Sequence, residues 1–169
     1  MKSFNLLRKI FLALVLALTF SSSQAFAADA VQVYDNDEKT FVSIYNQIAT
    51  KENLFTLETT PKFVENKGDL QVYSSNSIPA DTNVKALLLK NQSGAVSSIA
   101  ISAKNIEKLQ EALTVSLIIV GLNEKEFESL SANQKENSTT VWCESAQRNI
   151  HVEFFATSES IDVVIDATK

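Results

Sequence analysis

The chain has one histidine, His151, and the strand pattern around it places a carboxylate on the same face. Residues 148–155 and 161–167 alternate apolar and polar side chains, which predicts two antiparallel strands joined by a turn at residues 157–160. In the register that puts apolar side chains opposite one another, His151 faces Asp166. A carboxylate favours the charged form of a neighbouring imidazole, and such a pair can perform general acid–base chemistry.

A third strand, residues 139–144, is predicted to precede this hairpin through a turn at residues 146–147. Its register places Trp142 opposite His151, so that Trp142, His151 and Asp166 form one row across three strands. The indole of Trp142 could then stack on the imidazole ring. The opposite face carries only apolar pairs, as a core requires. These pairs are Val141 with Val152, Cys143 with Ile150, Val152 with Ile165, and Phe154 with Val163.

Three interpretations of the polar face stay open. The aromatic side chains could pack under a loop or a helix, with His151 at the edge. The face could be a binding surface, because aromatic side chains exposed among polar ones are typical of interfaces. His151 and Asp166 could form a catalytic pair. The candidate binding residues are Trp142, His151, Asp166 and Phe155. Phe155 is on the same face, where it pairs with Asp162. No residue is assigned a catalytic role.

Composition excludes several kinds of chemistry. Cys143 is the only cysteine, and the register turns it inward, away from His151. Thiol catalysis needs a histidine within hydrogen-bond reach of the sulfur, so we expect Cys143 to be buried and to behave as a small apolar residue. One histidine and one cysteine that face apart do not favour a zinc site, and three scattered glycines do not provide a phosphate-binding loop. We predict no metal site and no cofactor.

Two main helices must support these strands. Four apolar residues recur at helical spacing and predict a helix over residues 37–51. A second helix is predicted from about residue 103 to Gly121, with a third, short helix through Leu130 that begins with a capping box of Asn123 and Glu126. The apolar residues of the first helix are Phe41, Ile44, Tyr45 and Ile48.

The strand pattern predicts an antiparallel sheet. Pro61 should end the first strand, and Gly94 can adopt the positive φ that a hairpin turn needs. We therefore predict an α+β fold, in the order α-β-β-β-β-α-β-β-β, with about seven strands and the two main helices packed on one face. The predicted strands are residues 54–59, 70–74, 83–90, 95–102, 139–144, 148–155 and 161–167.

The first 27 residues have the three zones of a secretory signal peptide. Basic residues precede an apolar run over residues 10–20, and Ala25-Phe26-Ala27 matches the small-x-small pattern at which signal peptidase cuts. The apolar run is about half the ~20 residues that a membrane-spanning helix needs. We expect cleavage after Ala27, export to the periplasm or the exterior, no stable membrane anchor after cleavage, and a single globular domain over residues 28–169.

Charge narrows the choice of partner. Removing the three basic residues of the signal segment changes the formal charge from −5 to −8. An acidic surface repels phosphate groups, so nucleic acid is not an expected partner. We expect an exported, non-enzymatic small domain that binds a protein or peptide, with the oligomeric state left open. The alternatives are a small secreted hydrolase that uses carboxylates or the His151–Asp166 pair, and a structural envelope component with no discrete ligand.

Overall fold

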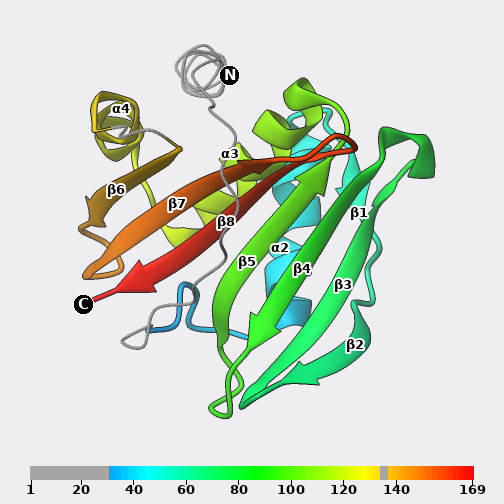
Figure 1. Ribbon diagram of the computed structural model, residues 1–169, viewed down its shortest axis with the longest axis horizontal. Helices are drawn as coiled ribbons and strands as arrows, with labels where there is room; N and C mark the ends of the chain where they lie inside the picture. Colours follow the sequence, from blue (N-terminus) through cyan, green and yellow to red (C-terminus); the bar gives the residue numbers. More distant parts are fainter. Residues whose placement is uncertain (1–30, 134–136) are drawn as a thin grey trace.

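The computed structural model describes residues 31–133 and 137–169, so the predicted signal peptide, residues 1–27, lies outside the described residues. The described chain has an α+β fold, as predicted (Figure 1). Its helices are α2 (Glu38–Lys51), α3 (Ile106–Val120) and α4 (Glu124–Ala132), with a 3₁₀ turn, η1 (Ala80–Thr82). Its strands are β1 (Thr56–Leu57), β2 (Lys62–Lys67), β3 (Leu70–Ile78), β4 (Val84–Lys90), β5 (Val96–Ala103), β6 (Ser138–Cys143), β7 (Arg148–Ala156) and β8 (Ile161–Thr168).

The strands form one antiparallel sheet in the order β1-β3-β4-β5-β8-β7-β6, and β2 also pairs with β3, with β1 at the end of β3 and β2 along its first half. The sheet therefore has eight strands where the sequence predicts about seven. The predicted strand at residues 54–59 is only two residues long, and the additional strand is β2. Every residue of β2 is exposed, so its sequence has no alternation between apolar and polar positions that would reveal a strand.

Capping side chains set the helix boundaries. Asp37 accepts a hydrogen bond from the backbone N–H of Thr40 at 2.8 Å and begins α2. The second main helix begins at Ile106, about three residues later than predicted, because Asn105 accepts from the N–H groups of Glu107 and Lys108. Gly121 ends α3 with a φ of +110°, and the predicted capping box begins α4.

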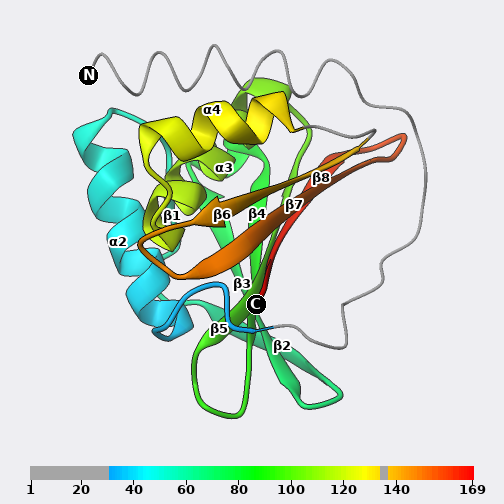
Figure 2. The same cartoon turned by 90° about the vertical axis from the view of Figure 1, so that its left-hand side faces the viewer.

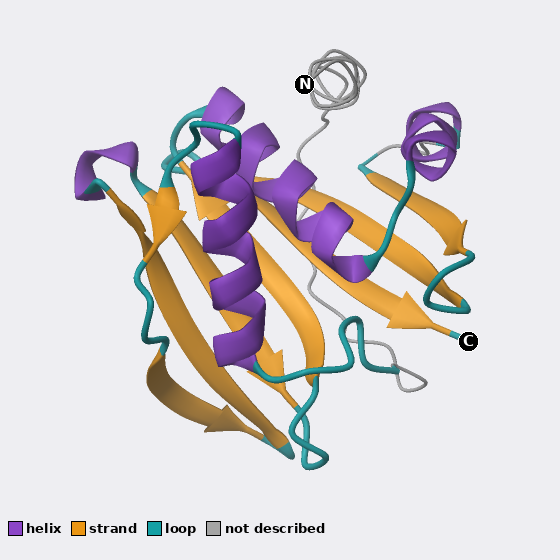
Figure 3. Ribbon diagram, turned by 180° about the vertical axis from the view of Figure 1, so that it is seen from behind, coloured by secondary structure: helices purple, strands orange, loops and turns teal. Residues whose placement is uncertain are grey.

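The helices pack on one side of the sheet, as predicted (Figures 2 and 3). We call this side the inner face and the other side the outer face. Almost every position of α3 from Leu109 to Leu117 is buried, which agrees with its apolar sequence. The predicted core residues of the last three strands all point inward and are buried: Val141, Cys143, Ile150, Val152, Phe154, Val163 and Ile165.

The segment before α2 joins the two halves of the sheet. Val31 forms a bridge with Ala167 of β8, and Tyr34 forms one with Val96 of β5, where these two strands diverge (Figure 1). The guanidinium of Arg148 fixes this segment. It donates to the carbonyl oxygen of Gln32, and it contacts both carboxylate oxygens of Asp35 at 2.8 and 3.0 Å.

A side chain occupies the outer side of the short strand β1. The amide group of Asn46, on α2, donates to the carbonyl oxygen of Leu57 at 2.8 Å and accepts from its N–H at 2.7 Å. Asn46 thus occupies the place of a neighbouring strand beside β1. An edge with its backbone groups occupied cannot pair with another strand.

Candidate functional site

The β7–β8 register is the predicted one. His151 pairs with Asp166, and Phe155 pairs with Asp162, all on the outer face. These pairs place the candidate histidine and its carboxylate on adjacent strands.

The predicted β6–β7 register is wrong by two residues. Trp142 pairs with Asn149, and His151 pairs with Thr140. The cause is the turn, which spans the four residues between Cys143 and Arg148 instead of two. A shift of two residues leaves each side chain on its predicted face. Trp142 is therefore on the outer face, but it is not directly opposite His151.

The hydroxyl of Thr140 holds the imidazole of His151. Its Oγ1 lies 2.9 Å from Nδ1 of His151. Among the residues that the structure describes, no hydrogen bond joins His151 to Asp166.

Asp166 also lies beside the Ser98 hydroxyl of β5. Burial raises the pKa of the Asp166 carboxyl, while the Ser98 hydroxyl and the His151 imidazole act in the opposite direction. The sequence alone does not connect Ser98 with this row, because β5 and β8 are separated along the chain by two helices and two strands.

Replacing Asp166 with asparagine is expected to raise the free energy of unfolding at neutral pH. The raised pKa means that the folded state binds a proton more readily than the unfolded chain does. The contribution of Asp166 to the free energy of unfolding therefore falls as the pH rises from about 3.9, the ordinary pKa of an aspartate, through the raised pKa of the folded state. Below that interval both states are protonated, so the variant and the wild type should converge. Urea titrations across this pH range provide the measurement, and a variant that is less stable at neutral pH would contradict the expectation.

On the outer face, the candidate residue at the β6 edge is the most accessible one. Trp142 is 48% exposed, whereas His151, Phe155 and Asp166 are partly buried. His151 and Phe155 are separated by four residues along β7, or about 13 Å. The centre of the face is closed by buried residues. They are Leu89, Ser98 and Val164. The four candidate binding residues thus form an extended surface rather than a pocket.

Cys143 is fully buried, as predicted. Its Sγ lies 3.5 Å from the hydroxyl of Ser145 and points to the inner face, away from His151. Within residues 31–133 and 137–169, no three histidine, cysteine or carboxylate side chains converge as metal ligands would. The same part of the chain contains no helix with the length and apolar character needed to cross a membrane.

A groove that the sequence reasoning missed lies at the ends of β3, β4 and β5, beside the β7–β8 turn. We call it the strand-end groove; its volume is about 720 Å³. The predicted hairpin around Gly94 could have placed Lys85 near Ser102, and the two do pair. The groove itself could not be derived, because it also requires η1 and the β7–β8 turn, which are distant in sequence.

Comparison of the chain with protein-family models, with curated proteins and with solved structures finds no match.

Proposed function

We propose that this protein is an exported, non-enzymatic domain that binds an extended, positively charged segment of a protein or peptide partner. The proposed contact surface is the part of the outer face on β6, β7 and β8, formed by Trp142, His151, Phe155 and Asp166. The proposal rests on one observation: Trp142 is 48% exposed on a sheet face over which no helix of the described residues lies. Export rests on the predicted signal segment, and protein recovered outside the cytoplasm should begin at Ala28.

Charge favours a cationic partner. Glu153, Asp162 and Asp166 share the outer face with the one histidine, and the whole chain has a formal charge of −5. Lysine or arginine side chains of a partner would supply the opposite charge, which steers association and selects the partner. An arginine could also stack on Trp142.

Fluorescence of Trp142 tests this proposal directly, because Trp142 is the only tryptophan of the chain. The probe is a peptide of alternating lysine and valine, acetylated and amidated so that it has no terminal charges. It should shift the emission of Trp142 to shorter wavelength and saturate. The matched peptide of alternating glutamate and valine should cause no such change.

Variants locate the contact. Phe155→Ala and Asp166→Asn should each weaken binding of the lysine peptide about three- to tenfold, the range expected for one interface side chain. The control is Phe63→Ala, which removes an exposed aromatic side chain from β2, outside the proposed contact surface. Equal binding of both peptides, or an emission spectrum that the lysine peptide leaves unchanged, would refute the proposal.

A further inference from the structure

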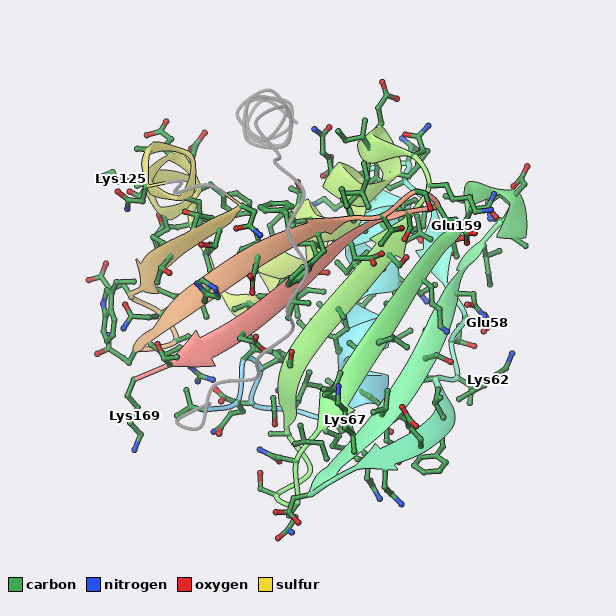
Figure 4. All side chains as sticks on the ribbon, in the orientation of Figure 1. Glu58, Lys62, Lys67, Lys125, Glu159 and Lys169 are labelled. Carbon is green, nitrogen blue, oxygen red and sulfur yellow. The ribbon has the colours of Figure 1, made fainter. Side chains whose placement is uncertain are left out.

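The strand-end groove is lined by four charged side chains. Its walls include two lysines, Lys85 and Lys104, and two glutamates, Glu58 and Glu159. Figure 4 shows Glu58 beside β1 and Glu159 at the tip of the β7–β8 turn, with the strand ends between them. The identity of the ligand depends on which of these four charges are already paired.

Glu58 is already neutralised. Its carboxylate contacts the ammonium of Lys62 at 3.0 and 3.3 Å and accepts a hydrogen bond from the side-chain amide of Asn76 at 3.2 Å. The hydrogen bond from Lys62 lowers the pKa of Glu58, so that this carboxylate stays ionised and engaged. Glu58 therefore does not compensate the lysines of the groove.

Lys85 and Lys104 have no ion-pair partner among the described residues. In the strand register Lys85 lies between Asn76 on β3 and Ser102 on β5, and Lys104 follows the end of β5. The groove that both lysines line is also lined by the hydroxyl and amide side chains of Asn76, Ser102 and Ser160. In a chain of net charge −5, two uncompensated lysines in one groove form a local site for an anion.

The remaining features limit the kind of anion. Ile78 is 50% exposed and, with Ala80 and Val84, gives the groove an apolar part. Glu159 would repel a second negative group, and so disfavours polyphosphates and other polyanions. The volume of about 720 Å³ lies in the range of pockets that hold small molecules or the end of a peptide.

We propose that the strand-end groove binds a single carboxylate group attached to an apolar chain, with Lys85 and Lys104 as its counter-ions. The C-terminus of an extended peptide and a small organic acid share this chemistry. The proposal goes beyond the outer-face surface and does not depend on it, because the two sets of residues do not overlap.

Nuclear magnetic resonance of the full-length protein tests the site. The probes are the peptide acetyl-Ala-Ala-Val-Leu with a free carboxylate, the same peptide with a C-terminal amide, and acetate. The free acid should cause saturable shifts in the backbone amide signals of Asn83, Lys85, Ser102 and Lys104. The amide should bind at least about tenfold more weakly, and the binding of the acid should weaken with added salt. Shifts of the same signals with acetate would assign the site to small acids; their absence with acetate would assign it to peptide C-termini.

Matched charge variants complete the test. Lys85→Gln and Lys104→Gln should each weaken binding of the free acid about three- to tenfold, and the double variant should abolish it. Lys125→Gln removes the same charge from α4, on the opposite side of the molecule (Figure 4), and should leave the affinity unchanged. All three lysines are exposed, so the variants should fold normally. Equal affinity for acid and amide, shifts outside the groove, or no response to the free acid at millimolar concentration would overturn the proposal.

Discussion

Phe41→Ala is expected to lower the free energy of unfolding by about 3–5 kcal/mol, the cost of emptying a large buried site. Phe41 is completely buried between α2 and the sheet, and its ring contacts Tyr34 edge to face at 5.8 Å. Tyr34 belongs to the segment that bridges to β5, so this change should also loosen that segment. A urea titration followed by circular dichroism measures the loss.

Phe63→Ala is the matched control. Phe63 makes a similar edge-to-face contact, with Tyr73 at 5.7 Å, but it is 53% exposed. We expect a loss of at most about 1 kcal/mol, because little apolar area returns to water. Equal losses for the two variants would mean that burial by the helices does not determine stability in this sheet.

Gly121→Ala is expected to destabilise the protein by about 2–3 kcal/mol, from a strained backbone together with a steric clash. Gly121 has a φ of +110°, and an added Cβ would lie 2.3 Å from the hydroxyl oxygen of Ser145. That hydroxyl donates to the carbonyl oxygen of Gly121 at 2.9 Å, so moving it aside breaks the bond that joins the end of α3 to the β6–β7 turn.

Gly94→Ala separates these two effects. Gly94 has a φ of +90° but nothing within 4 Å of the position of an added Cβ. This variant should therefore show only the backbone strain, about 1 kcal/mol. Thermal unfolding of the two variants gives the comparison; if Gly94→Ala costs as much as Gly121→Ala, the contact with Ser145 is not the cause.

The sequence predicted the parts of the fold in which burial and local spacing agree. The faces of β6, β7 and β8 follow from alternation, because one wrong step would bury His151 and expose Phe154. Alternation does not distinguish Val152 from Ile150 as the partner of Val141, since both point inward. This ambiguity caused the two-residue error in the predicted β6–β7 register. The error produced the predicted Trp142–His151 pair, which the observed register does not contain.

Strand β2, the Ser98–Asp166 neighbourhood and the strand-end groove were not predicted, because they depend on pairing between strands and not on a local pattern. Residues 62–67 form a strand by pairing with β3, although none of their side chains is buried, so no apolar pattern predicts it. The Ser98–Asp166 neighbourhood and the strand-end groove depend on β5 lying beside β8. The two strands are far apart in sequence and α3 packs against both, so local sequence does not reveal that they are neighbours.

The hydrogen bonds between Asn46 and Leu57 affect the order in which the protein opens. The amide proton of Leu57 belongs to a strand, yet its acceptor is a side chain of α2 at 2.7 Å. Its exchange with solvent deuterium should therefore follow the local unfolding of α2 rather than the separation of β1 from β3. This one strand amide would then report on the opening of α2, and the outer side of β1 would become available to another strand only when α2 moves away.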